Sequence, residues 1–467
     1  MDSLFEDCLR DAVGDDAASV VCKALSCPAS VSVRLNPFKW SAEERDAGTR
    51  FDCIVRQVPW SPYGLLLDGR PNFTLDPFWH AGAYYVQDSS AMFVGEIFRR
   101  CLQQLPAGED GNIVRVLDLC AAPGGKTTDL AASLRERYGY GFVLVANEVI
   151  RSRAGVLADN TALWGDPNVV VTNADPSAFA SLAGFFDIIV ADVPCSGEGM
   201  FRKDPEAVRQ WSRENVSLCQ ARQRRIVADV WPALKEGGVL VYSTCTFNRY
   251  ENDDNVKWIC ENLGAESRGP GMSDFCGDAY GCGWKVMSAS FGCSLLPGLV
   301  PGEGQYCAAV TKTSRAAMPS SGRASRTRNR VSGPAEWFNV PVSFRSSGTT
   351  VVAEPSVIAD DVQLVSSSVR MIRSGCAAGE VKGRTVVPSA DLALNYMLRE
   401  DAFPAAELDL MTALAFLHRD TIVLADMQKG FVMVGYCGLP LGFVKNLGSR
   451  CNSLHPGSRR IRMDIDK

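Results

Sequence analysis

Several features that would place a protein in a membrane or an export pathway are missing from this chain of 467 residues. No apolar run reaches the roughly 18 residues that a helix needs to cross a bilayer. The first residues carry acids and lack the basic stretch and apolar core of a secretory signal. We therefore expect a protein that is not attached to a membrane and that works in the cytoplasm.

Patterns of metal-binding residues are also scarce. The chain has three His and 17 Cys, and no two Cys are spaced as C-x-x-C. Zinc sites are usually built from such pairs or from several His, so we expect no metal. An odd number of Cys without an export signal favours reduced thiols, most of them small buried side chains.

An excess of positive charge is missing as well, because the formal net charge is −5. A protein with this balance does not bind nucleic acid through bulk charge, although local patches can still do so. Basic residues gather in three clusters, and each taken alone is typical of a solvated surface. The clusters are Arg222, Arg224 and Arg225; Arg315, Arg323, Arg326, Arg328 and Arg330; and Arg459, Arg460 and Arg462.

An alternation of strand-like and helix-compatible segments begins near residue 79. Short apolar runs alternate with longer helical stretches, which is typical of right-handed crossovers between parallel strands. The sequence therefore predicts an α/β fold with a doubly wound, mostly parallel sheet. The strand-like runs are 114–119, 142–146, 169–172, 187–191 and 238–242, and the helix-compatible stretches are 127–137, 149–160 and 205–234.

Composition divides the chain into four parts. Residues 1–75 are expected to form a small N-terminal α+β domain, and residues 76–311 the domain with the doubly wound sheet. Residues 312–335 have six Lys or Arg and no acid, which predicts a basic flexible linker. Residues 336–467 are expected to form a compact C-terminal module with strand-like pieces at 421–424 and 430–435.

A glycine-rich turn, Cys120-Ala-Ala-Pro-Gly-Gly-Lys126, follows the first strand of the predicted sheet. Such a turn lets a nucleotide-like ligand approach the backbone and a helix N-terminus. A phosphate-binding P-loop would need Gly at position 120, where the chain has Cys. Glu148 ends the second strand, where an acid can bind the ribose of a dinucleotide or of S-adenosylmethionine. Asp175 follows the third strand and fits either an adenine contact or a simple turn before Pro176.

Two Cys residues, Cys195 and Cys245, follow two further strands of the predicted sheet. The carboxyl ends of parallel strands share one edge of a sheet, so both thiols should face the same crevice as the glycine turn. A thiolate that adds to carbon 6 of a cytosine makes carbon 5 nucleophilic, and a carboxyl such as Asp192 can stabilise the adduct. Lys126 either orients Asp192 or the base, or is simply solvated. Spacing alone decides neither which Cys attacks nor whether both are merely buried.

Four long motifs resemble those of the Nol/Nop/Sun (Fmu-type) RNA cytosine-C5 methyltransferases. They are VLDLCAAPGGKTT (116–128), NEVIRSR (147–153), ADVPCSGEGMFRKDPEA (191–207) and YSTCTFNRYEND (242–253), in the order of that family. The resemblance implies a Rossmann-like methyltransferase domain. It also implies that S-adenosylmethionine is the cofactor and that carbon 5 of an RNA cytosine is methylated through a covalent cysteinyl intermediate.

The same resemblance assigns roles to individual residues. It makes Cys245 the nucleophile and Cys195 the helper for release of methylated RNA, with Asp192 and Lys126 beside them. It places the cofactor against the turn and the acids that follow the strands. The residues of that cofactor site are Cys120, Ala121, Ala122, Pro123, Gly124, Gly125, Lys126, Glu148, Asp175 and Asp192.

Residues 197–203 and 439–462 are similar to the RsmF-type branch, which implies 16S ribosomal RNA or the small ribosomal subunit as partner and a C-terminal PUA-like RNA-binding module. Segments 84–92, 296–310 and 415–420 depart from the pattern and leave the exact nucleotide open. The alternatives are a tRNA methyltransferase and a non-catalytic ribosome-assembly factor. Arg202 and Lys203 are expected near the target strand, or else paired with Asp204 or Glu206.

Overall fold

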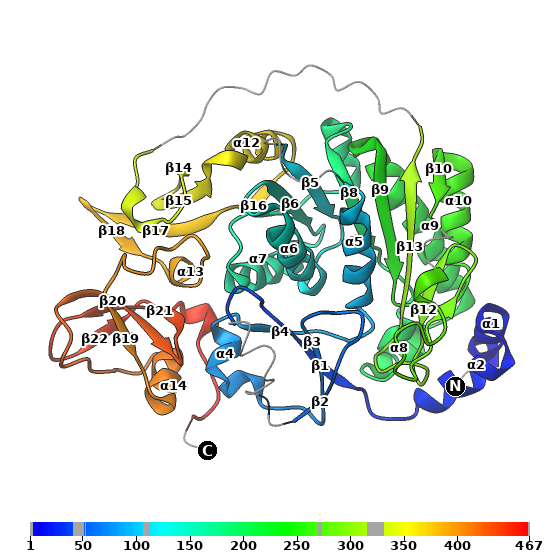
Figure 1. Cartoon of the computed structure of the whole chain (residues 1–467), viewed down its shortest axis with the longest axis horizontal. Helices are drawn as coiled ribbons and strands as arrows, with labels where there is room; N and C mark the ends of the chain where they lie inside the picture. Colours follow the sequence, from blue (N-terminus) through cyan, green and yellow to red (C-terminus); the bar gives the residue numbers. More distant parts are fainter. Residues whose placement is uncertain are drawn as a thin grey trace.

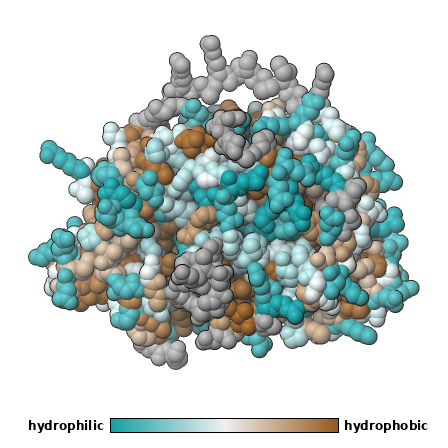
Figure 2. All heavy atoms as spheres, viewed as in Figure 1, coloured by the Kyte–Doolittle hydropathy of each residue, from teal (hydrophilic) through white to brown (hydrophobic). Residues whose placement is uncertain are grey.

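A computed structural model describes residues 3–40, 51, 53–105, 112–268, 273–314 and 331–465 of the chain. Most of the expected basic linker, including the Arg cluster between residues 315 and 330, lies outside these described residues. No helix within them is long and apolar enough to cross a membrane. On the face drawn in Figure 2, hydrophilic and hydrophobic residues are interspersed.

A large central sheet forms the middle of the molecule (Figure 1). Five neighbouring strands are parallel, in the order β9-β8-β5-β6-β7, so the predicted α/β doubly wound fold is confirmed. Their sequences are almost continuously apolar because both faces of the sheet are covered. The bounds are β5 Val114–Asp118, β6 Phe142–Asn147, β7 Val169–Thr172, β8 Phe186–Asp192 and β9 Leu234–Thr244.

Antiparallel strands extend this sheet at both edges. On one side, β13 (Gln305–Lys312) pairs with β9 and is followed by β12 (Gly292–Leu295) and β11 (Met287–Ser288). The short β10 (Ala265–Ser267) also pairs with β13. On the other side, β16 (Met371–Arg373) pairs with β7. A segment of the expected C-terminal module therefore completes the central sheet.

Helices cover both faces of the sheet, and successive strand residues enter different cores. In β5, Val116 packs with α5, α6 and α7, whereas Leu117 packs in the core that contains α9, α10 and α12. The helices are α5 Phe93–Gln103, α6 Gly125–Tyr138, α7 Arg151–Trp164, α9 Arg213–Val230, α10 Asp253–Leu263 and α12 Ala359–Ser368.

Two secondary-structure expectations were wrong. The stretch 205–234 is not one helix, because α8 (Pro205–Gln210) ends before the buried Trp211 and α9 starts after Ser212. The Ser212 hydroxyl oxygen accepts a hydrogen bond from the Asn215 N–H at 3.1 Å and caps the new helix. Residues 421–424 form no strand, and the chain becomes extended only in β20 (Gly430–Tyr436).

The described residues of the N-terminal part include the helices α1 and α2 and a four-stranded sheet in the order β2-β3-β1-β4. This sheet reaches past residue 75, which we took as the end of the domain, because β4 pairs with β1. The short helix α4 lies just before β4 and packs against α14 and β21 of the C-terminal part. The bounds are α1 Ser3–Val13, α2 Asp15–Ala24, β1 Val31–Leu35, β2 Ile54–Gln57, β3 Gly64–Leu67, α4 Pro77–His80 and β4 Tyr84–Val86.

The C-terminal part contains two further four-stranded sheets, drawn from yellow to red in Figure 1. One has the order β14-β15-β17-β18 and the other β19-β20-β21-β22. The bounds are β14 Val342–Ser347, β15 Thr350–Pro355, β17 Cys376–Lys382, β18 Thr385–Pro388, α13 Ala390–Ala393, β19 Ala405–Glu407, α14 Leu410–His418, β21 Leu439–Asn446 and β22 Cys451–Ser453.

A buried ion pair ties α6 to the loop before β7. The Arg135 guanidinium donates to both carboxylate oxygens of Asp166, at 2.6 and 3.1 Å, and to the side-chain oxygen of Asn168 at 2.7 Å. Both charged side chains are buried, with 6% and 1% of their surface exposed. A buried charge that loses its partner lowers the free energy of unfolding.

We predict that Asp166→Ala lowers the free energy of unfolding by about 3 kcal/mol, because the Arg135 charge stays buried without a carboxylate. Urea denaturation followed by tryptophan fluorescence measures the loss. The matched control is Asp361→Ala, whose partner Arg115 lies 2.9 Å away in a more exposed pair. That control should lose about 1 kcal/mol or less. Equal losses in the two variants would contradict the prediction.

Candidate active site

The glycine turn joins β5 to α6 at the carboxyl edge of the parallel strands. Gly124 precedes the helix with φ of 114°, a left-handed conformation that favours glycine. A Cβ atom on Gly125 would lie 3.2 Å from the ring of Tyr85, so a larger residue would crowd β4. The buried Arg34 of β1 donates to the Gly125 carbonyl at 3.1 Å and to the Thr128 hydroxyl at 2.6 Å. The N-terminal sheet therefore supports the turn directly.

Three acids surround the turn. Burial, and then the charges of Asp118, Asp192 and Glu148, raise the pKa of the Cys120 thiol. Burial also raises the pKa of Asp118 to about 7, and one of its carboxyl oxygens has no hydrogen-bond partner within the described residues. Glu148 is buried, accepts from the Ile150 N–H at 2.9 Å and lies 3.2 Å from Arg153. This acidic set suits a ligand that carries a sulfonium charge and ribose hydroxyl groups.

Asp175 has a local role in the loop after β7. One of its carboxylate oxygens accepts hydrogen bonds from the N–H and the hydroxyl of Ser177, at 3.1 and 2.7 Å, and these bonds lower its pKa. Asp175 is exposed. The geometry matches the turn that the sequence suggested, and a contact with adenine stays a prediction.

Asn147, which we did not select from the sequence, ties the ends of three strands together. Its side-chain N–H groups donate to the carbonyls of Leu119 and Ala174, at 3.2 and 3.0 Å. Its oxygen accepts from the Thr172 hydroxyl at 2.9 Å. Asn147 therefore fixes the loops that carry the turn and Asp175. The signals in the sequence were its place directly before Glu148 and at the start of the motif NEVIRSR (147–153).

The two selected thiols lie side by side. The strands β8 and β9 are parallel neighbours with Asp192 opposite Ser243, so the loops that follow them are adjacent. The sulfur atoms of Cys195 and Cys245 are 3.2 Å apart and form no disulfide. Contact with the Cys245 sulfur, together with burial, raises the pKa of the Cys195 thiol well above its ordinary value.

Asp192 stands at the centre of a polar group next to the thiols. One oxygen accepts from the Lys126 ammonium at 2.9 Å, and the other from the Ser243 hydroxyl at 2.8 Å and the Gln305 amide at 3.1 Å. Burial lowers the pKa of Lys126, but Asp192 outweighs this effect and the net pKa is raised. Lys126 is therefore protonated and holds Asp192 in place. Gln305, a residue that we missed, also donates to the Thr244 carbonyl at 2.9 Å.

Glu251 holds the loop that carries Cys195, although Glu251 itself follows Cys245 in sequence. Its carboxylate accepts from the Ser196 N–H at 3.0 Å and from the Gln223 amide at 2.7 Å. Gln223 also donates to the Pro194 carbonyl at 3.0 Å. Burial raises the pKa of Glu251.

Glu198 makes the reciprocal connection from the Cys195 loop to the Cys245 loop. Its carboxylate accepts from the Asn248 N–H at 3.2 Å, the Asn248 amide at 2.8 Å and the Trp211 indole at 3.0 Å. Burial and the nearby Glu251 raise the pKa of Glu198 to about 7. Both acids stand inside the motifs that we quoted, but their roles depend on contacts that span about fifty residues, between positions 196 and 251 and between 198 and 248.

Arg202 and Lys203 pair with residues that the sequence did not indicate. The Arg202 side chain is 7% exposed and donates to Glu303 at 2.7 Å, and Lys203 lies 3.6 Å from Asp88. Asp88 in turn accepts from the Glu303 N–H at 3.1 Å. Asp88 and Glu303 belong to two segments that depart from the family pattern, so these departures contact each other. Asp204, the expected partner, caps α8 by accepting from the Glu206 N–H.

Three family models match the chain, in the same order as the parts described above. Residues 1–89 match the N-terminal domain of 16S rRNA methyltransferase RsmF, and residues 105–308 match 16S rRNA methyltransferase RsmB/F. Residues 403–461 match the PUA domain of methyltransferase RsmF. These matches confirm the resemblance of the motifs and the PUA-like character of the C-terminal part.

Curated relatives carry the name ribosomal RNA small subunit methyltransferase F. The protein from Cronobacter sakazakii is 38% identical over 264 residues, so the matched part spans 55% of this chain and 52% of that relative. The protein from Escherichia coli O157:H7 is 30% identical over 453 residues, which cover 92% of this chain and 90% of the relative.

A solved structure shares the fold. The crystal structure of a methyltransferase homologue from Pyrococcus horikoshii covers 67% of this chain and 95% of its own, with a TM-score of 0.52 and 24% identity. The fold, the three family models and the relative that spans most of the chain agree. The chain therefore belongs to the RsmF family of S-adenosylmethionine-dependent ribosomal RNA methyltransferases.

Proposed function

We propose that this protein methylates carbon 5 of a cytosine in 16S ribosomal RNA, with Cys245 as the nucleophile and Cys195 as the group that assists release. One observation carries the proposal. Two thiols lie 3.2 Å apart beside Asp192 and Lys126, at the sheet edge that also holds the cofactor turn. A single buried structural Cys would need no second thiol and no charged group next to it.

The chemistry accounts for these groups. The Cys245 thiolate adds to carbon 6 of the cytosine, and the S–C bond pushes electron density to carbon 5. S-adenosylmethionine supplies an electrophilic methyl group when bound. Carbon 5 takes the methyl group as its bond to the sulfonium sulfur breaks. Cys195, in its thiolate form, takes the proton from carbon 5, and the bond between Cys245 and carbon 6 then breaks with its electron pair returning to the Cys245 sulfur. The Asp192 carboxylate accepts a hydrogen bond from the exocyclic amino group at the N3 edge of the ring and stabilises the adduct.

The assignment of the two thiols rests on the family resemblance. The two sulfur atoms lie 3.2 Å apart, so they share one environment and can exchange a proton. Only a thiolate attacks carbon 6, and the sulfur beside it is placed to take the proton from carbon 5. This geometry serves either order, and with the resemblance we assign attack to Cys245 and release to Cys195.

The residues of the turn fit S-adenosylmethionine. Glu148 provides a carboxylate at the end of β6, where a ribose can be bound, and Gly124 and Gly125 let the turn pack closely against Leu157 and Tyr85. Asp118 adds a buried carboxyl oxygen that has no other partner within the described residues. We assign to this site the turn from Cys120 through Lys126, together with Glu148, Asp175 and Asp192.

The assignment of 16S ribosomal RNA as substrate rests on the names of the relatives and on the match to the PUA domain. A target cytosine has to be unpaired or flipped out before a thiol can reach carbon 6. Bisulfite sequencing of ribosomal and transfer RNA, from strains with and without the gene, tests this choice. We expect one protected cytosine in 16S RNA that disappears on deletion. Loss of a protected cytosine in transfer RNA instead would replace the proposed substrate.

We predict that Cys245→Ala abolishes methyl transfer to 16S RNA, because no thiolate then adds to carbon 6. Transfer of tritiated methyl groups measures activity, and calorimetric titration measures S-adenosylmethionine binding, which should stay within about twofold. The matched control is Cys260→Ala on α10, away from the strand ends, which should keep wild-type activity. Normal turnover in Cys245→Ala would remove this residue as the nucleophile.

We predict that Cys195→Ala accumulates a covalent complex with RNA, because attack by Cys245 still occurs but release is blocked. The complex appears as a slower protein band on a denaturing gel after incubation with RNA and cofactor. The double variant that also carries Cys245→Ala should show no such band. If Cys245→Ala trapped RNA and Cys195→Ala did not, the two roles would be exchanged.

A further inference from the structure

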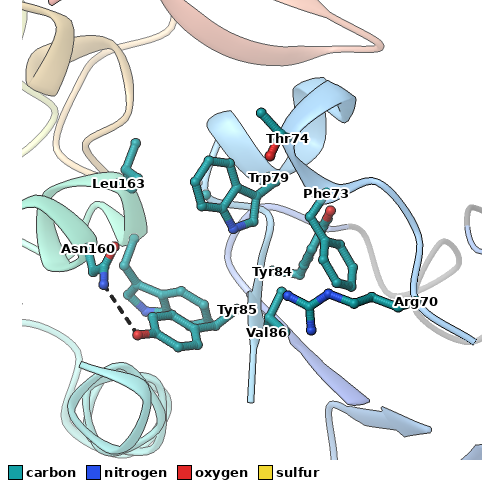
Figure 3. A pocket seen from close by; sticks show the side chains of 11 residues that line it. Arg70, Phe73, Thr74, Trp79, Tyr84, Tyr85, Val86, Asn160 and Leu163 are labelled. Atoms are coloured by element: carbon teal, nitrogen blue, oxygen red, sulfur yellow. Dashed lines mark hydrogen bonds between the residues drawn. The ribbon is translucent and has the colours of Figure 1, made fainter. Parts of the chain in front are cut away.

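Two cavities outside the thiol site are neighbours that share part of their lining, and together we call them the groove. The first, of about 290 Å³, lies between β4, the segment before α4 and the end of α7 (Figure 3). The second, of about 440 Å³, lies between α7 and residues 455–463 of the C-terminal part. They share the lining residues Thr74, Trp79, Asn160 and Leu163. The groove thus connects the N-terminal part, the methyltransferase sheet and the C-terminal part.

Aromatic rings dominate the first cavity. Figure 3 shows Trp79, Phe73, Tyr84 and Tyr85 around it, with the Arg70 side chain beside Phe73. The Arg70 guanidinium lies 5.5 Å from the centre of the Phe73 ring and is exposed. Flat aromatic and guanidinium surfaces are the usual platforms for unstacked bases of single-stranded RNA.

A buried hydrogen-bond donor also lines the first cavity. Trp164 is 2% exposed, and its indole N–H has no partner within the described part of the chain. The Arg34 guanidinium covers one side of the Trp164 ring at 4.7 Å from its centre. A buried donor without a partner is costly. The Trp164 ring lies in the wall of the cavity and adds an aromatic surface to it.

The second cavity adds positive charge. Arg460 and Arg462 line it and are exposed, whereas Arg459 is engaged with Asp391 at 2.7 Å. Asp159 is the one acid among the residues that line the two cavities, and Arg459 lies 3.4 Å from it. The groove is therefore locally positive in a chain of net charge −5. This charge complements the phosphates of RNA.

The groove also contacts the cofactor turn. The Tyr85 hydroxyl and the Asn160 amide both donate to the Pro123 carbonyl, at 3.1 and 2.8 Å. Both residues line the first cavity. A ligand in that cavity would therefore lie one side chain away from the turn that holds the cofactor.

We propose that this groove binds a single-stranded segment of the RNA substrate outside the target cytosine, with an unpaired base in the aromatic cavity and phosphates beside Arg460 and Arg462. The proposal rests on the proposed function, because it takes the ligand to be the RNA that is methylated. It assigns substrate affinity to residues that do not contact the reacting atoms.

The test measures binding and turnover separately with the full-length protein. The probe for binding is an RNA fragment of 16S RNA around the methylated cytosine, titrated without cofactor and followed by fluorescence anisotropy. We expect Trp79→Ala to weaken RNA binding about tenfold through the loss of stacking. KM for RNA should rise by a similar factor, while kcat and S-adenosylmethionine binding stay unchanged. The matched control is Trp258→Ala, a partly buried residue on α10 outside the groove.

The double variant Arg460→Ala and Arg462→Ala tests whether these two arginines bind the phosphates of the RNA. Loss of two phosphate contacts should reduce the slope of log affinity against log salt by about 1.4, since each contact to single-stranded RNA contributes about 0.7. The control is the double variant Arg222→Ala and Arg225→Ala on α9, which removes the same charge from another exposed surface. Equal slopes for the two double variants would overturn the assignment of phosphates to this groove.

Cross-linking keeps the proposal testable if Trp79→Ala does not fold. RNA with 4-thiouridine at single positions is irradiated on the wild-type protein, and the attached peptides are identified by mass spectrometry. We expect cross-links in residues 70–86 and 455–463, and their absence overturns the proposal. If the wild-type protein binds RNA through the groove but methylates nothing, the proposed function fails while the groove stands. If it methylates RNA and the groove variants bind as tightly as wild type, the groove fails.

Discussion

The pairing of β8 with β9 is the constraint on which the candidate active site depends. The register sets Asp192 opposite Ser243, so two loops from distant parts of the chain leave the sheet side by side. Glu198 from the first loop binds the second, and Glu251 from the second binds the first. Neither loop can move far without breaking hydrogen bonds to a buried carboxyl group. The separation of the two thiols therefore follows from the sheet and from these reciprocal bonds.

Buried acidic side chains fix the relative position of the two loops, because a buried carboxyl group without hydrogen-bond donors destabilises the fold. A carboxyl group taken out of water has to be matched by donors, and Glu251 and Glu198 are matched by backbone N–H groups and by the amides of Gln223 and Asn248. Displacement of a loop by even one residue would leave the acid without these donors. An apolar contact at the same place would hold the loops together but would not fix their register.

The sequence predicted the parts of the site that depend on strand order and missed the parts that depend on long-range contacts. The apolar runs located the parallel strands within a few residues, and the shared edge of those strands put Cys195, Cys245 and the glycine turn together. No periodic pattern could reveal β16, which has three residues. The break at Trp211 was also hidden, because Phe5, on which it packs, lies in the first helix. The partner of Arg202 is Glu303, about a hundred residues away.

The net charge of −5 is compatible with an RNA substrate, because the fold engages some arginines in internal hydrogen bonds and leaves others exposed. Arg34, Arg135 and Arg202 form hydrogen bonds within the molecule, to the glycine turn, to Asp166 and to Glu303. Such residues contribute to the count of basic groups but not to the surface. Arg70 stays exposed at the aromatic cavity, and Arg460 and Arg462 stay exposed at the neighbouring cavity of the groove. Affinity for RNA then depends on where these few charges lie and on stacking, and not on the total charge of the chain.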